Sequence, residues 1–128
     1  MARDARDEAR RQLSALAADP TAHWAPARSL EEDAALLGRL LMAAASHQQS
    51  AGRAADVAPD DVGAALSLFE DMRLSLDRLE TQVVIEARRR DMEWRQIAQY
   101  QGLNSSQAAS QRYQRLMTRL EEIRQGVR

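Results

Sequence analysis

The chain has 128 residues, a length that fits one domain or one domain with an arm, and 45% of its residues are apolar while 29% are charged. Because it holds no cysteine, disulfide frameworks, thiolate metal sites and cysteine nucleophiles are excluded. Only His23 and His47, far apart in the sequence, could serve a histidine-rich metal site, so we expect neither a metal nor a cofactor. No apolar run is long enough to cross a membrane and the charged first residues lack a signal-peptide core, so we expect a cytoplasmic protein.

The charge is distributed unevenly along the chain. Residues 1–87 hold 9 Arg and 15 acidic residues, a net charge of -6, whereas residues 88–128 hold 9 Arg and 4 acidic residues, a net charge of +5, which together give the -1 of the whole chain. A basic end on an acidic chain indicates that this end meets a polyanion. Basic residues that complement the dipole at a helix end would give the same pattern.

Helix formers dominate the sequence and strand formers are sparse, so we predict an all-α fold of about five helices. We expect residues 1–28 to form an N-terminal helical arm, with its helix over about 3–18, followed by a linker. The linker holds Trp24, which we expect to plug the core. Residues 29–128 are predicted to form one helical domain with a helix-turn-helix at 93–117.

The second predicted helix begins at Ser29 and loses its apolar pattern after Ala45. Ser29 has Glu32 three residues further on, the spacing of a capping box in which each side chain accepts a hydrogen bond from the other residue's free backbone N–H group. We therefore expect a helix from Ser29 that frays after Ala45.

The third predicted helix is the long central one, from Pro59 to about Arg90, because a proline and two acids suit the first turn of a helix. Arg73 and Glu80 interrupt its heptad pattern, so a long two-stranded coiled coil is not indicated. We expect one apolar side to be buried in the chain's own domain and the other to meet a second copy, giving a homodimer through residues 60–90. Its apolar residues form two neighbouring stripes, Val62, Leu66, Phe69, Leu76 and Val83 beside Leu68, Met72, Leu79 and Ile85.

The segment from 93 to 125 has the pattern of a helix-turn-helix. A short helix over about 93–101 is followed by Gly102, which can adopt the left-handed conformation that ends a helix. Asn104 or Ser105 then caps a second helix that continues to about Gln125. Ile97 and Leu103 are expected to face the core, and the small residues Ala98, Ala108 and Ala109 allow the two helices to cross closely.

This segment resembles the C-terminal helix-turn-helix of small DNA-binding regulators from high-GC bacteria, over about residues 90–118. Where those relatives have Ser-Arg-Gln-Ala-Ala, this chain has serine at position 106, and Gln111 stands where an arginine is common. The resemblance implies DNA binding through the second helix of the pair. It is carried by Trp94, Ile97, Ala98, Gly102, Leu103, Ser105, Ser106, Gln107, Ala108, Ala109, Arg112, Tyr113, Arg115 and Leu116.

Helical spacing predicts which side of that second helix faces DNA. One stripe is apolar and should pack inward, namely Ala109, Tyr113, Leu116, Leu120 and Ile123. The opposite side is rich in glutamine and serine, which hydrogen-bond to base edges, so the predicted base-reading residues are Ser106, Gln107, Ser110, Gln111 and Gln114. The predicted phosphate contacts are Ser105, Arg90, Arg95, Arg112, Arg115 and Arg119. We expect no wing, the β-hairpin that follows the second helix in some helix-turn-helix proteins.

No arrangement of residues in the sequence indicates catalysis, because the glycines are scattered and neither histidine has a nucleophile-like setting. We therefore expect a non-enzymatic, nucleoid-associated protein that binds double-stranded DNA, either as a transcriptional regulator or as a chromosome-associated factor. The alternative that the sequence leaves open is a helical adaptor, whose acidic front and C-terminal helix pair bind a component of the transcription machinery or another protein.

Overall fold

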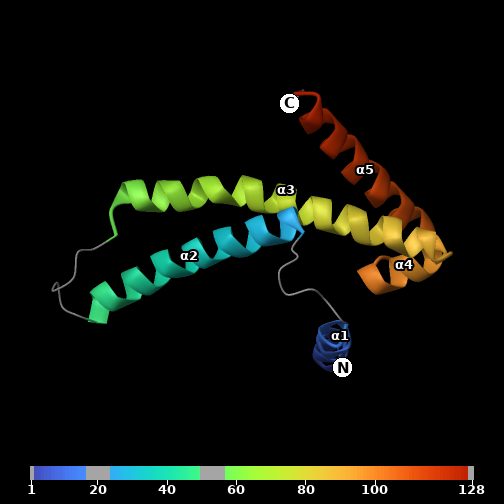
Figure 1. The fold of residues 1–128 in the computed structure, drawn as a ribbon, viewed down its shortest axis with the longest axis horizontal. Coiled ribbons are helices and arrows are strands. Elements are labelled where there is room, and N and C mark those ends of the chain that lie inside the picture. The colour runs from blue at the N-terminus through green and yellow to red at the C-terminus, as the bar shows by residue number, and fades with distance from the viewer. Residues whose placement is uncertain (1, 17–23, 50–56, 127–128) are drawn as a thin grey trace.

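The computed structural model describes residues 2–16, 24–49 and 57–126, and within these ranges it contains five helices and no strands (Figure 1). The all-α prediction is therefore confirmed. The helices are α1 (Ala2–Ser14), α2 (Ala25–Gln49), α3 (Pro59–Arg89), α4 (Trp94–Gln101) and α5 (Ser106–Arg124). No helix in the described ranges is long and apolar enough to cross a membrane.

Helix α1 is shorter than the predicted arm helix, and it is largely exposed. It ends at Ser14, whose hydroxyl donates a 2.8 Å hydrogen bond to the carbonyl of Arg10. Leu13, and Leu16 just after the helix, are both exposed. In Figure 1, α1 stands apart from the other helices.

Helix α2 begins four residues before the predicted start, so the expected capping box at Ser29 is wrong. The carbonyl of Trp24 accepts hydrogen bonds from the backbone N–H groups of Ala27 and Arg28, with Pro26 in the first turn, where a proline is tolerated. The Glu32 carboxylate accepts a hydrogen bond from the Arg28 guanidinium at 3.0 Å, so it pairs along the helix surface. Trp24 is 45% exposed, which makes the predicted core position for it wrong as well.

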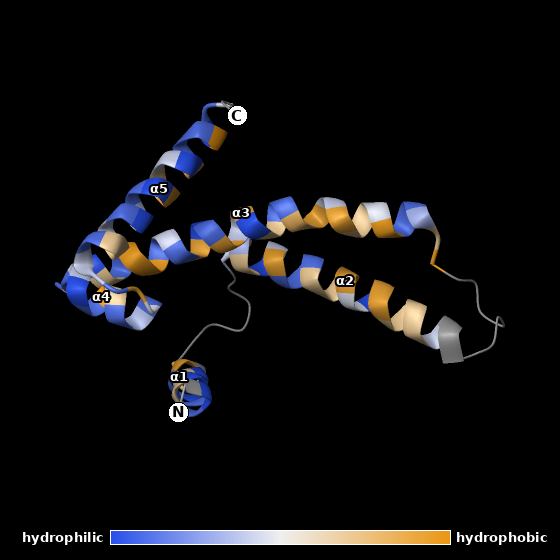
Figure 2. Ribbon diagram, turned by 180° about the vertical axis from the view of Figure 1, so that it is seen from behind, coloured by the Kyte–Doolittle hydropathy of each residue, from blue (hydrophilic) through white to orange (hydrophobic). Residues whose placement is uncertain are grey.

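Helices α2 and α3 form a hairpin in which α2 lies along the first half of α3 (Figure 1). The predicted start of α3 is confirmed, and the Asp61 carboxylate accepts a hydrogen bond from the backbone N–H of Ala58 at 2.9 Å. Helix α2 remains helical to Gln49, beyond the predicted fraying point. Figure 2 shows hydrophobic residues along both helices, and the stripe of α3 that includes Leu68 and Met72 is half-buried.

The turn between α4 and α5 has the predicted geometry. Gly102 adopts φ 73° and ψ 25°, the left-handed conformation. The backbone N–H of Leu103 donates to the carbonyl of Ala98 at 2.8 Å, and that of Gly102 donates to the carbonyl of Gln99 at 3.2 Å. This pair of bonds is the Schellman arrangement that ends many helices. Ser105 then caps α5, because its hydroxyl accepts a hydrogen bond from the backbone N–H of Ala108 at 3.1 Å.

The most deeply buried apolar residues lie where α4 and α5 meet the C-terminal part of α3. Val84, Ile97, Ala98 and Ala109 form one buried cluster, and none of them is more than 4% exposed. The predicted inward positions of Ile97, Ala98 and Ala109 are therefore confirmed. The half-buried residues packed against this cluster include Met92, Trp94, Leu103 and Tyr113.

We predict that Gly102→Ala lowers the free energy of unfolding by about 1 kcal/mol, because a side chain disfavours a left-handed backbone conformation. Apart from the adjacent residues of the chain, no atom lies within 4 Å of the position that the new Cβ would take, so the penalty comes from the backbone conformation. Chemical denaturation followed by circular dichroism measures it. Gly38→Ala is the matched control, because Gly38 lies inside α2 with equal space and alanine there should stabilise the helix by about 0.5–1 kcal/mol. Equal effects of the two changes would contradict this account of the turn.

Candidate nucleic-acid interface

The inner face of α5 is defined by the residues that it packs against α4 and α3. Ala109 is 1% exposed and Leu116 is 9% exposed, whereas Tyr113 and Leu120 are half-buried. The ring of Tyr113 lies beside that of Trp94 at the start of α4, with 5.6 Å between the ring centroids. The predicted inward stripe is therefore confirmed as far as Leu120, and it weakens at Ile123, which is 37% exposed.

The opposite face of α5 carries the residues predicted to read bases. Gln107, Gln111 and Gln114 are exposed, as is Ser106, while Ser110 is half-buried at the edge. Their side chains take part in no hydrogen bond with another described residue. This row of uncharged donors and acceptors is open to solvent on the first three turns of α5, and its orientation follows from the burial of the inner face.

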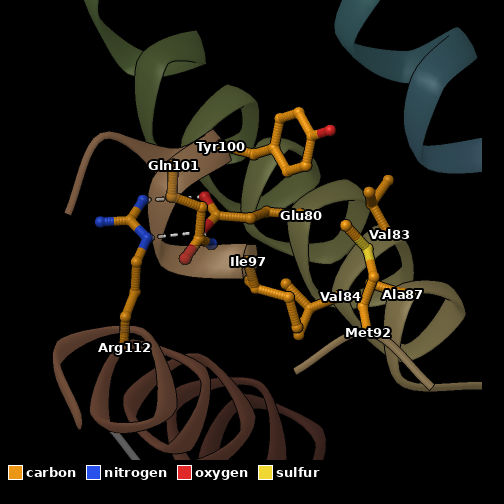
Figure 3. Close-up of a pocket in the computed structure, with 9 residues that line it drawn as sticks. All are labelled: Glu80, Val83, Val84, Ala87, Met92, Ile97, Tyr100, Gln101 and Arg112. Carbon is orange, nitrogen blue, oxygen red and sulfur yellow. Dashed lines mark hydrogen bonds and ion pairs between the residues drawn. The ribbon is translucent and has the colours of Figure 1, made fainter. Parts of the chain in front are cut away.

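Arg112, predicted to contact phosphate, joins α5 to α3 through Glu80 (Figure 3). Its guanidinium donates two hydrogen bonds to the two carboxylate oxygens, one of them Nη2 to Oε1 at 2.8 Å. The Gln101 amide donates a third bond to Glu80, at 3.2 Å. The hydrogen bond from Arg112 lowers the pKa of Glu80 despite partial burial, and the same bond raises the pKa of Arg112.

Arg119 makes a second connection between the same two helices. Its guanidinium nitrogens lie 3.0 Å from an oxygen of Glu70 and 3.1 Å from an oxygen of Asp77. These acids were not predicted as partners, although Glu70, Asp77 and Glu80 are seven and three residues apart, which places them on one face of α3. Arg112 and Arg119 are seven apart and share one side of α5, so a row of acids on one helix and a row of arginines on another was the available signal.

The remaining basic residues of this region divide into paired and unpaired ones. Arg90 is paired with Glu86, and the guanidinium of Arg88 stacks over the Trp94 ring at 5.1 Å. Arg95 and Arg115 are exposed and have neither an acidic partner nor a ring contact among the described residues. Five arginines were predicted to contact phosphate. Within the described part of the chain, Arg95 and Arg115 are the two of them whose charge is free to meet a phosphate.

A cavity of about 500 Å³ lies beside the Glu80–Arg112 pair, between α3 and α4 (Figure 3). Its floor is apolar, with Val84 and Ile97 in the centre, and the charged pair with Gln101 forms one end. Across residues 2–16, 24–49 and 57–126, no group of histidine and acidic side chains could hold a metal ion.

Comparisons of the chain with protein-family models, with curated proteins and with solved structures found no match. The resemblance to DNA-binding regulators, which depends on residues 90–118, stays a prediction. What this surface binds must therefore be inferred from its geometry and charge.

We predict that Glu80→Gln lowers the free energy of unfolding at neutral pH by about 1 kcal/mol, because Arg112 then loses a charged partner that is partly shielded from water. The lowered pKa of Glu80 means that the folded chain binds this proton less tightly than the unfolded chain. The stability that the pair contributes is therefore present above the ordinary carboxyl pKa of 4.5 and is lost as the pH falls through the lower folded value.

Urea denaturation at neutral pH and at about pH 3 measures both effects, and the difference between the variant and the parent chain should shrink at the lower pH. Glu31→Gln, on the exposed surface of α2, is the control and should change stability little at either pH. A Glu80→Gln variant as stable as the parent at neutral pH would show that the pair does not hold α5 to α3.

Proposed function

We propose that the chain is a DNA-binding protein whose α5 enters the major groove of double-stranded DNA with the face that carries Gln107, Gln111 and Gln114. The role that fits this activity is transcriptional regulation or chromosome-associated binding within the nucleoid of the cytoplasm, without enzymatic activity. The observation that carries the proposal is the exposed row of glutamine and serine side chains on a helix whose other face is fixed by burial.

The geometry of the turn supports this proposal. A helix-turn-helix places the first residues of its second helix against base edges, and the major groove is wide enough to admit one α-helix. In this chain Ser106, Gln107 and Ser110 lie on the first two turns of α5, directly after the cap at Ser105. Glutamine can form a pair of hydrogen bonds with adenine, and serine can bond to several bases.

The distribution of arginine supports a modest phosphate contribution. Arg95 at the start of α4 and Arg115 on the flank of α5 can contact the DNA backbone without first leaving an acidic partner. Arg90 is paired with Glu86, four residues earlier, on the exposed surface. Exposed ion pairs contribute little to folding stability, so replacing Glu86 by a phosphate as the partner of Arg90 costs little free energy. Arg112 and Arg119 act in this proposal as positioning residues that hold α5 on α3.

A second copy of the chain completes the proposed DNA-binding unit. Helix-turn-helix proteins commonly bind as dimers that read two half-sites. The stripe of α3 that begins at Val62 and ends at Val83 is exposed along its length, which supports the homodimer through residues 60–90. Each copy would then supply one α5.

A salt titration of the affinity for duplex DNA tests the activity itself. Binding that releases counterions from phosphate weakens with a log–log slope of about -0.9 for each phosphate neutralised. Sequencing of the duplex fragments that the purified protein retains from a random pool reports whether a preferred site exists and whether that site is symmetric. No affinity for duplex DNA at about 50 mM salt would contradict the proposal and favour the protein-binding adaptor.

We predict that Arg115→Ala weakens binding to all duplexes alike and makes the salt slope shallower by about 0.9 per copy, because the change removes a phosphate contact. Arg39→Ala is the matched control, since Arg39 is an exposed arginine of α2 on a different part of the molecule. Fluorescence anisotropy on unrelated duplexes at several salt concentrations measures the effect. If the Arg39 and Arg115 variants lose the same affinity, the assigned surface is wrong.

We predict that Gln111→Ala relaxes the preference at particular base pairs by about 1–3 kcal/mol while it leaves binding to unrelated sequences nearly unchanged. Competition between the preferred duplex and its single-base variants measures the change. Gln82→Ala, on the exposed surface of α3, is the glutamine control and should leave the preference intact. An unaltered preference in the Gln111 variant would show that this face does not read bases.

A further inference from the structure

The most prominent unexplained surface of the molecule is an apolar stripe on α3. Its members are separated by four, three, seven and seven residues, so they follow one line along the helix. Each of them is between 38% and 67% exposed, although the neighbouring stripe with Leu68 and Met72 is half-buried. The exposed stripe consists of Val62, Leu66, Phe69, Leu76 and Val83.

The described helices do not cover this stripe. Helix α2 packs along α3, and α4 and α5 pack near the C-terminal end of α3. The stripe still stays exposed from its first member to its last, over about 32 Å of helix. In the described ranges, no large side chain is fully buried, so the α2–α3 hairpin has no complete core of its own. A long helix that presents apolar residues at matching intervals would fit this stripe along its whole length. A second copy of α3 has this length and this spacing.

We infer that two copies of the chain pair through this stripe with their α3 helices antiparallel, around a two-fold axis that passes between Met72 and Arg73. This register rests on the homodimer proposed above and does not depend on DNA binding. Because the interface is isologous, the same stripe serves on both copies.

The spacing of the stripe is what selects this register. Turning α3 end for end about that axis brings Val62 opposite the partner's Val83 and Phe69 opposite the partner's Leu76. The same operation brings Leu66 opposite the partner's Leu79. All six positions are apolar, so the paired stripes bury apolar side chains against one another.

Charge disfavours the parallel alternative and favours the antiparallel one. In a parallel pair in register, Arg73 would face the partner's Arg73, which places like charges together on the seam. In the antiparallel register, Arg73 lies opposite the partner's Met72 and Glu80 lies opposite the partner's Ala65.

The ends of α3 add to this preference. The helix begins with the acids Asp60 and Asp61 and ends with the bases Arg88 and Arg89, so antiparallel copies place the acidic end of one beside the basic end of the other. The helix dipoles are then opposed as well. The arrangement also carries the two helix-turn-helix units to opposite ends of the paired helices, related by the two-fold axis as a symmetric DNA site requires.

Disulfide crosslinking tests the register cleanly, because the chain has no cysteine of its own. Two single variants are made, Val62→Cys and Val83→Cys, the second carrying an affinity tag so that a mixed dimer has a distinct size. Both positions are exposed, and circular dichroism checks that each variant keeps its helix content. The variants are mixed, left to exchange subunits and then oxidised under mild conditions. We expect a covalent dimer that contains one copy of each variant.

Each variant oxidised alone is the control and should stay uncrosslinked, because the antiparallel register holds the two copies of either position about 32 Å apart, far beyond disulfide reach. A covalent dimer of Val62→Cys alone would show a parallel pair and overturn the inference. Sedimentation equilibrium of the parent chain gives the second reading, with a dimer mass expected at micromolar concentration. A monomer mass, or a dimer mass without the mixed crosslink, also overturns it. Neither reading involves DNA, so failure here is distinct from failure to bind a duplex.

Discussion

The structure depends on the burial of Ala98 and Ala109 where α4 and α5 meet the C-terminal part of α3. Small side chains allow α4 and α5 to cross closely, and Val84 and Ile97 complete the buried cluster. Once Ala109 is buried, the rotation of α5 about its own axis is set, and every third or fourth residue on the other side must face solvent. The outward direction of the glutamine row is thus a consequence of packing.

Arginine has two uses in this molecule, and they follow from whether the side chain reaches an acid on α3. Arg112 and Arg119 point toward α3, where they pair with carboxylates, and the hydrogen bond from Arg112 lowers the pKa of Glu80. Arg95 and Arg115 keep their charge available in the described part of the chain. The basic C-terminal end of the sequence is therefore partly neutralised within the fold, which reduces the positive charge left for a polyanionic partner. Recognition of such a partner would then depend more on the uncharged glutamine face of α5.

Local signals in the sequence predicted much of the fold, because each had one dominant physical cause. The start of α3, the left-handed Gly102 and the cap at Ser105 all follow from backbone chemistry that needs no tertiary partner. The failures lie where two local signals compete or where partners are distant. At the start of α2, the proline in the first turn and the Arg28–Glu32 pair outweighed the box at Ser29, and the cross-helix partner of Arg112 is 32 residues away. The base-reading residues stay predictions, since the fold establishes their exposure and leaves their ligand untested.

The central claim is that the glutamine face of α5 is the surface that meets duplex DNA. Amide chemical-shift mapping of the ¹⁵N-labelled chain during titration with a duplex tests it residue by residue. We expect the largest shifts at Ser106, Gln107 and Ser110 on the first turns of α5, with Arg95 at the start of α4, and little change along α2. Shifts concentrated on α2, or no shifts on α5 at saturating duplex, would contradict the account.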